Sequence, residues 1–304
     1  MLWHTLIALS SGFLFALAFL FMNRAQSAGV KRGNELLAVT LINLTCTLVI
    51  FGFQFGGGLF GGVPTWDLVA IGWFVVAGLL SSFGGRYTVL IAMKHIGPSR
   101  AASFKSFSPV VAALAGWLWL GQSLDNQIIL ATLLLGVGLW LLNGQLKGKQ
   151  SVIDSGANLA LGWTFGAASA ACWGLGYIAR RLGLESMASP IVGVIIGALL
   201  TSVILITMNY KSRGLPLRLS YFGPPTSRMP MLLAGLFSTG GQIAAFTALH
   251  LMENTAIAVI LISLDSLFML LFSRFVIGKS EVITPLSFVY MLIALSGCAL
   301  AILH

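Results

Sequence analysis

The stretch Ser82-Phe83-Gly84-Gly85-Arg86 decides the fold, because it returns 156 residues later as Ser238-Thr239-Gly240-Gly241-Gln242. A second correspondence joins residues 118–123 (Leu-Trp-Leu-Gly-Gln-Ser) to residues 275–280 (Phe-Val-Ile-Gly-Lys-Ser), at an offset of 157. Apolar composition alone could imitate a repeat, but paired glycines and matching ends of apolar runs favour a true one. We therefore predict two copies of one unit, at residues 1–150 and 151–304.

Composition places both copies in a membrane. Of the 304 residues, 58% are hydrophobic and only 8% are charged, with a mean hydropathy of +0.96. A soluble domain carries about a quarter charged residues, because water must wet its surface. This chain has too few charges to cover a water-facing shell, which excludes a soluble globular protein.

Apolar runs of the length that a helix needs to cross a bilayer recur from end to end. They lie at residues 3–22, 35–55, 68–92, 100–120, 127–144, 159–179, 188–209, 229–250, 255–277 and 282–303. Since each copy holds five runs, an odd number, the second copy must enter the membrane upside down. We expect an all-α integral membrane protein with ten transmembrane helices as two inverted five-helix repeats, an architecture typical of secondary transporters.

The net charge of +9 is explained by topology. The loops between runs 1–2, 3–4, 5–6, 7–8 and 9–10 hold thirteen of the 17 basic residues, namely Arg24, Lys31, Arg32, Lys94, Arg100, Lys147, Lys149, Lys211, Arg213, Arg218, Arg228, Arg274 and Lys279. The opposite side holds only Arg180 and Arg181. Basic loops face the cytoplasm, so we expect a multi-pass protein of the cytoplasmic (inner) membrane with both termini outside the cytoplasm, and no nucleic-acid partner.

Residues 1–22 lack a basic start and a cleavage site, so we interpret them as the first helix and not as a signal peptide. The three cysteines lie inside apolar runs and the four histidines are far apart in sequence. We therefore expect no disulfide, no metal site and no cofactor. No nucleotide-binding motif is present, so transport energy would come from a proton or solute gradient, or from exchange.

Several motifs support a family resemblance. They are residues 92–102 (Ala-Met-Lys-His-Ile-Gly-Pro-Ser-Arg-Ala-Ala), 108–111 (Ser-Pro-Val-Val), 119–122 (Trp-Leu-Gly-Gln), 171–174 (Ala-Cys-Trp-Gly) and 248–256 (Ala-Leu-His-Leu-Met-Glu-Asn-Thr-Ala). Over essentially the full chain, the sequence resembles the drug/metabolite transporter superfamily, in particular its EamA family with two five-helix repeats. That family usually carries glutamate where Gln122 and Lys279 stand, and proline where Ser266 stands.

Three ionisable residues lie within apolar runs, where a charge is costly and usually functional. Asp265 is eleven residues after Asn254, about 16 Å along a helix and close to midplane. Lys105 could snorkel towards the basic loops, or line a cavity. Arg86 lies at a depth similar to that of Lys105. We expect Asp265 to pair with Lys105 or Arg86, which leaves one cation over for an anionic group of a substrate.

Three further residues complete the predicted site. Ser108 shares a small, mildly polar helix face with Lys105, which suits either a cavity wall or close helix packing. Gln242 is the repeat partner of Arg86. Trp173 stands at the Trp-Gly position that the resemblance implies for the first helix of a repeat, where it would line the cavity or pack.

The sequence therefore favours a secondary transporter that moves a small metabolite with an anionic or zwitterionic group by alternating access. Its partners would be the substrate, the lipid bilayer and a proton or counter-solute, with the protein as a monomer or homodimer. One alternative is a flippase for a lipid-linked group, which needs a lateral opening. An intramembrane enzyme would need clustered catalytic groups, and one central aspartate without a deep histidine argues against it.

Overall fold

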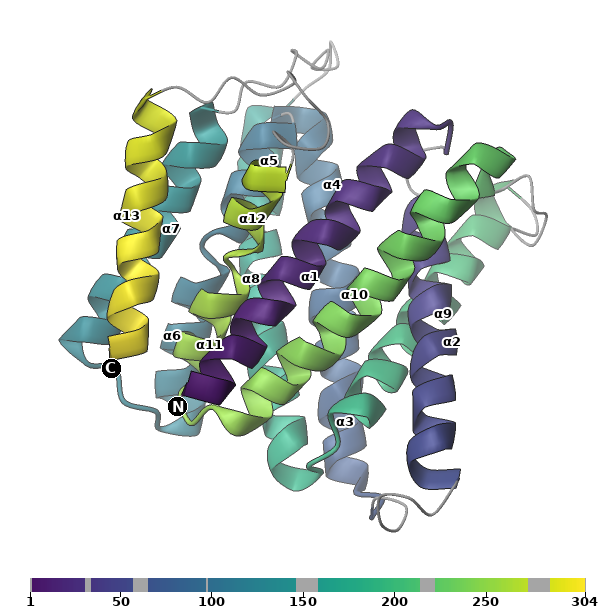
Figure 1. The fold of residues 1–304 in the computed structure, drawn as a ribbon, viewed down its shortest axis with the longest axis horizontal. Coiled ribbons are helices and arrows are strands. Elements are labelled where there is room, and N and C mark those ends of the chain that lie inside the picture. The colour runs from purple at the N-terminus through teal and green to yellow at the C-terminus, as the bar shows by residue number, and fades with distance from the viewer. Residues whose placement is uncertain are drawn as a thin grey trace.

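The computed structural model describes residues 2–30, 34–56, 65–96, 98–145, 158–213, 222–272 and 285–303. Every regular element in these ranges is a helix. Figure 1 shows the helices running side by side, with the N- and C-terminal ends at the same end of the bundle.

The described residues form ten spans, as predicted. The first five are α1 (Leu2–Ser27), α2 (Asn34–Gly56), the continuous α3–η1–α4 (Leu68–Ala77, Gly78–Gly84, Gly85–Ile96), the interrupted α5–α6 (Pro98–Lys105, Ser108–Leu120) and α7 (Asn126–Gln145). The second five are α8 (Leu159–Ser186), α9 (Pro190–Arg213), α10 (Pro225–Leu251), the interrupted α11–α12 (Thr255–Ile262, Asp265–Phe272) and α13 (Pro285–Leu303).

The exterior of the bundle suits lipid. Six of the spans are long and apolar enough, by length and composition, to cross a membrane as single helices. Large apolar side chains such as Phe53, Trp119 and Leu236 point outward. Small residues fill many helix contacts inside the bundle, as expected where the lipid is as apolar as the core and close packing holds the helices together.

The hydrogen bonds between helices reveal the inverted repeat. Ser11 on α1 donates to the Gly241 carbonyl on α10, and Ser169 on α8 donates to the Gly85 carbonyl at the start of α4, both at 2.9 Å. The two glycines are the pair that the sequence repeat aligned at an offset of 156, and the two serines are 158 residues apart. The first helix of each repeat therefore packs against the third span of the other repeat.

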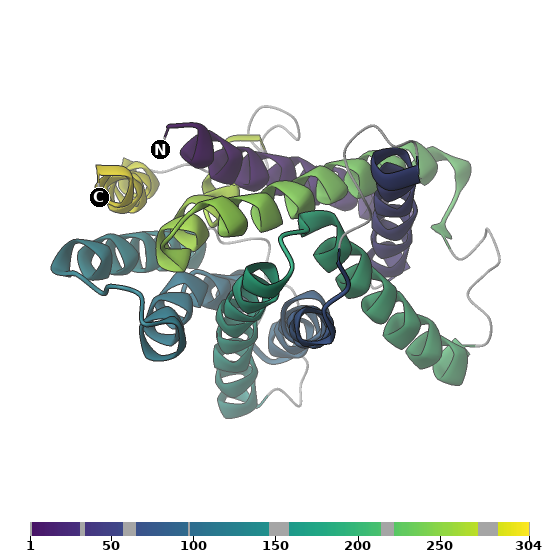
Figure 2. The same cartoon turned by 90° about the horizontal axis from the view of Figure 1, so that it is seen from below.

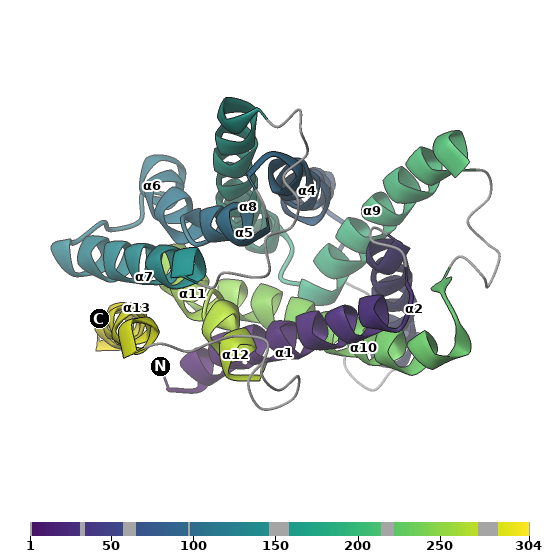
Figure 3. The ribbon, with the colours of Figure 1, turned by 90° about the horizontal axis from the view of Figure 1, so that it is seen from above.

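Helix neighbours follow the same symmetry. Helix α1 packs along α10, and α8 packs along α3 and α4, while α7 and α13 pair at one end of the molecule (Figures 2 and 3). The predicted boundary at residue 150 lies outside the described residues, so the division into 1–150 and 151–304 stays a prediction.

The fourth and ninth spans are broken, although the sequence predicted continuous helices over 100–120 and 255–277. Turns at Ser106–Phe107 and at Ser263–Leu264 interrupt them, again 157 residues apart. In the first break, Pro109 has no N–H and its ring would clash with the carbonyl four residues earlier, which favours a break at this point. The second break has no proline, but it places the carboxylate of Asp265 in the first turn of α12.

A wide π-helical segment, η1, interrupts the third span between Gly78 and Gly84. The glycines allow other helices to come close here: a Cβ on Gly78 would lie 3.1 Å from the Cα of Gly197 on α9. π-helical turns often accompany functional sites, and this one borders the candidate pocket.

Candidate functional site

An ion pair joins the two broken spans. Lys105 Nζ bonds the Asp265 carboxylate, which is the first of the two pairings that the sequence predicted. Lys105 is the last residue of α5 and Asp265 is the first of α12. A cation at a helix C-terminus and an anion at a helix N-terminus both oppose the partial charges of the backbone. The pair therefore stabilises two half-helix ends as well as itself.

Aromatic rings surround this pair. Lys105 Nζ lies 5.5 Å from the ring centre of Phe19 on α1 and 5.3 Å from that of Trp173 on α8, within range of cation–π attraction. At the offset of 158 set by the two serines, Trp173 corresponds to Phe15, and Phe19 to Tyr177. The two first helices thus each supply one ring to Lys105, from positions that are not equivalent in the repeat.

Ser108 begins α6 directly after the first break. Its hydroxyl is buried and has no hydrogen-bond partner among the described residues. Its carbonyl faces Gly174, where a Cβ would lie only 2.8 Å away. α8 therefore approaches α6 closely at this point, and a cavity wall or close packing as the role of the Ser108 side chain stays a prediction.

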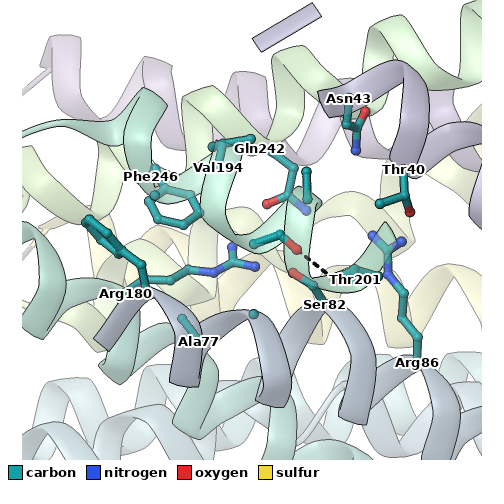
Figure 4. Close-up of a pocket in the computed structure, with 15 residues that line it drawn as sticks. Thr40, Asn43, Ala77, Ser82, Arg86, Arg180, Val194, Thr201, Gln242 and Phe246 are labelled. Carbon is teal, nitrogen blue, oxygen red and sulfur yellow. Dashed lines mark hydrogen bonds between the residues drawn. The ribbon is translucent and has the colours of Figure 1, made fainter. Parts of the chain in front are cut away.

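A separate pocket lies between the two repeats. The space open to the centre of a water molecule is about 20 Å³ in this conformation, and the total empty space, with the open solvent at its mouth, is about 400 Å³. Its walls come from α2, α3, η1 and α4 of the first repeat and from α8, α9 and α10 of the second. Its polar lining residues are Thr40, Asn43, Ser82, Arg86, Arg180, Thr201 and Gln242. Figure 4 shows the guanidinium groups of Arg86 and Arg180 entering from opposite ends, with Gln242, Ser82 and Thr201 between them.

The position of Arg180 differs from the prediction, which placed this residue in a loop on the same side as the termini. It lies within α8, two turns before the helix ends at Ser186, and is only 2% exposed. Its guanidinium donates to Ser81 Oγ at 2.8 Å and lies 5.3 Å from the ring centre of Tyr177 and 4.7 Å from that of Phe246. The apolar run ends earlier than the helix, because α8 continues past Ala179 with its arginine turned into the protein.

The next residue, Arg181, contacts the end of a helix and not the pocket. The Arg181 guanidinium donates to the carbonyls of His250 and Met252 at 3.3 and 2.8 Å, and also to that of Leu249, at the end of α10. The last carbonyls of a helix lack intrahelical partners. Arg181 therefore caps α10, and only Arg180 faces the pocket.

The pocket is cationic. Among the described residues, its lining holds two arginines and no carboxylate. Arg86 and Arg180 carry like charges in one pocket, and neither forms an ion pair with a carboxylate among the described residues. Asp265 is instead paired with Lys105. The charge of +2 in the pocket is thus uncompensated within the described part of the chain.

The six predicted site residues fall into two groups. Lys105, Asp265 and Trp173 gather at the ion pair, with Ser108 beside the adjoining break, whereas Arg86 and Gln242 line the pocket. Trp173 stands between the groups, because its indole covers Lys105 and also packs on Gly85, next to Arg86.

Sequence reasoning missed Arg180 and Tyr177. The signal available was helical spacing, since Trp173, Tyr177 and Arg180 at positions i, i+4 and i+7 share one face of a helix. Tyr177 is buried, and its ring centre lies 5.3 Å from the Arg180 guanidinium.

Gln122, where the family usually has glutamate, joins the two broken spans at their far ends. Its amide oxygen accepts from the Thr255 backbone N–H at 3.0 Å, and its amide nitrogen donates to Thr255 Oγ1 at 2.9 Å. A neutral amide can both donate and accept, which a carboxylate cannot. Lys279, the other departure, lies outside the described residues.

A second hollow, of about 730 Å³ including open solvent, lies along α2, α9 and α10. Its lining includes Gln54 and Phe55 near the end of α2, Pro190 at the start of α9 and Thr247 of α10, and it carries no charged residue. Among the described residues, no three His, Cys, Asp or Glu side chains are grouped to hold a metal ion.

Ten helices in two inverted repeats, with a polar pocket at the repeat interface, define a secondary-transporter architecture. Residues 2–144 match the EamA-like transporter family. This match, which covers the first of the two predicted units, agrees with the family that the motifs predicted, within the drug/metabolite transporter superfamily. The chain is accordingly a multi-pass membrane protein, and the family that it matches transports small molecules.

The comparison with curated proteins found no match. A solved structure described only as the crystal structure of a protein shares 17% sequence identity with this chain, over 99% of this chain and 96% of that one, with a TM-score of 0.74. At this identity the likeness shows the fold alone.

Proposed function

We propose that this protein is a secondary transporter that moves a small metabolite with an anionic or zwitterionic group across the cytoplasmic membrane by alternating access. The observation that carries the proposal is the pocket between the repeats, which presents Arg86, Arg180 and Gln242 without a carboxylate. Guanidinium groups recognise carboxylates and phosphates through paired hydrogen bonds. An anion is the natural ligand of such a surface.

The interrupted spans support the alternating-access mechanism. Turns at Ser106–Phe107 and Ser263–Leu264 divide two helices that lie in equivalent positions of the repeats. A break in a membrane helix lets its halves pivot separately, and broken helices are common where transporters bind or release substrate. The Lys105–Asp265 pair lies at both breaks, so its formation or loss would accompany such a movement.

The orientation follows from the loops. Arg24 at the end of α1, Lys94 at the end of α4 and Arg228 at the start of α10 all lie on the side opposite the termini. By the positive-inside rule this side is cytoplasmic, and both termini lie outside the cytoplasm.

Uptake into proteoliposomes tests the proposed function. The purified full-length protein is reconstituted and supplied with a panel of radiolabelled anionic and zwitterionic metabolites. We expect saturable uptake of at least one panel member, reduced at least tenfold by Arg86→Gln. Uptake no faster than in protein-free liposomes across the panel would contradict the proposal.

Coupling is tested separately. Asp265→Asn is assayed with and without an imposed pH gradient. If Asp265 carries the coupling proton, the variant loses the response to the gradient. An unchanged response would show that this carboxylate is not the coupling group, and exchange for a counter-solute would then be measured with preloaded liposomes.

A further inference from the structure

The charges in the pocket restrict the substrate further than the proposed function does. Lys105 is neutralised by Asp265, so the predicted surplus cation is not Lys105. Two cations remain instead of one, Arg86 and Arg180, and both face the same pocket. Uncompensated charges in a membrane interior are costly. A ligand with two negative charges would neutralise both arginines, whereas a single negative charge would neutralise one.

The arrangement of the two arginines restricts the shape of the ligand. Arg180 is held at one end of the pocket by Ser81, Tyr177 and Phe246. Arg86 enters from the other end (Figure 4). Neutral polar groups of Gln242, Ser82 and Thr201 lie between them. Such a pocket offers two anion sites with an uncharged polar middle.

A zwitterion fits this pocket less well. Its ammonium group would lie near one guanidinium, and the two like charges would repel each other. None of the described lining residues has a carboxylate to accept that ammonium group. Of the two substrate classes in the proposed function, the lining therefore favours the anionic one.

We infer that the substrate is a small dianion with an anionic group at each end, such as an α,ω-dicarboxylate, which binds one end to Arg86 and the other to Arg180. This inference rests on the proposed function, since it names the substrate class of the same pocket. Gln242 and Thr201 would hydrogen-bond the middle of the molecule.

Competition uptake in proteoliposomes tests the inference. The probes are four- and five-carbon α,ω-dicarboxylates, monocarboxylates of the same lengths, α-amino acids and inorganic phosphate. We expect a dicarboxylate to have a KM at least about tenfold below that of the matched monocarboxylate, because it makes a second charge-assisted contact. Equal KM values, or a preference for amino acids or for phosphate, would overturn the inference.

Variants assign the preference to the two arginines. Arg86→Gln and Arg180→Gln should each raise the KM of the dicarboxylate towards that of the monocarboxylate, because only one cation remains. Arg228→Gln is the matched control, since Arg228 is exposed near the start of α10 and outside the pocket. Retention of the dicarboxylate preference in a folded Arg86→Gln protein would overturn the inference, even if Arg180→Gln does not fold.

The two proposals fail in different ways. If no probe is transported or competes, both the proposed function and the inference are contradicted. If monoanions or zwitterions are transported without preference for the dianion, the transporter remains and only the inference is overturned.

Discussion

Two regions of this molecule bury positive charge, and they do so differently. At the broken spans, Lys105 meets Asp265, two helix ends and two aromatic rings, so its charge is compensated within the protein. In the pocket, Arg86 and Arg180 face each other across neutral groups without a carboxylate in the lining. We infer from this difference that the paired charge of Lys105 stabilises the protein, and we propose that the unpaired charges of the two arginines recognise a ligand.

The largest effect is expected from breaking the compensated pair. Asp265→Asn or Lys105→Met leaves one charge without its partner. Removing one partner of a buried pair costs about 3 kcal/mol or more, and we expect the lower end here, because the Lys105 side chain is 24% exposed. Thermal unfolding in detergent measures this loss as a reduced Tm.

The double variant, Lys105→Met with Asp265→Asn, is the control for that prediction. It removes both charges and should recover at least half of the lost stability. If each single variant were as stable as the wild type, the pair would not be structural, and the contrast between the two regions would disappear.

The next largest effect is expected from overpacking at Gly85 and at its repeat partner Gly241. A Cβ on Gly85 would lie 2.7 Å from the Trp173 ring, and one on Gly241 would lie 2.9 Å from the Phe15 ring. Such overpacking costs about 2 kcal/mol. Gly85→Ala and Gly241→Ala should therefore lower the Tm by similar amounts, because the repeat makes the two sites equivalent.

Gly52→Ala is the matched control, since a Cβ there meets nothing within 4 Å. This helical position should keep or slightly gain stability, because alanine favours a helix more than glycine does. A large difference between Gly85→Ala and Gly241→Ala would argue against equivalent packing in the repeats.

Arg86→Gln should separate recognition from stability. Because Arg86 has no carboxylate partner in the pocket, its loss leaves no buried charge unpaired. We expect at least a tenfold loss in kcat/KM, equal to about 1.4 kcal/mol, with a Tm close to that of the wild type. A fall in Tm as large as that of Asp265→Asn would show that Arg86 is structural.

The smallest effect is expected at Ser81. Its hydroxyl accepts from Arg180, which keeps its two aromatic contacts in Ser81→Ala. We expect the KM to rise about threefold, because one of several contacts that hold the guanidinium is lost. Ser10→Ala, which removes an exposed hydroxyl bonded to the Ile7 carbonyl, should leave the KM unchanged. Equal KM values in both variants would contradict a positioning role for Ser81.

Much of the fold could be predicted from the sequence, because hydrophobic length and repetition are properties of the chain itself. Runs of apolar residues predicted the ten spans. The alignment of Gly85 with Gly241 predicted the repeat, and the carbonyls of these two glycines accept equivalent hydrogen bonds. The breaks at residues 106–107 and 263–264 were not predicted, because an apolar run does not show where a helix turns. Pro109 gave a signal for one break, and no comparable residue marks the other.

The sequence by itself determined that Lys105, Arg86 and Asp265 belong to membrane-spanning helices, because each of them stands inside an apolar run. Only the tertiary structure decided which charges meet. Asp265 pairs with Lys105 across 160 residues of sequence, and the rotation of α8 turns Arg180 inward to face Arg86. The position of a residue in an apolar run predicts how deep it lies in the membrane. Whether its charge is neutralised depends on the distance to a charge on another helix, and that distance is set by the packing of the helices.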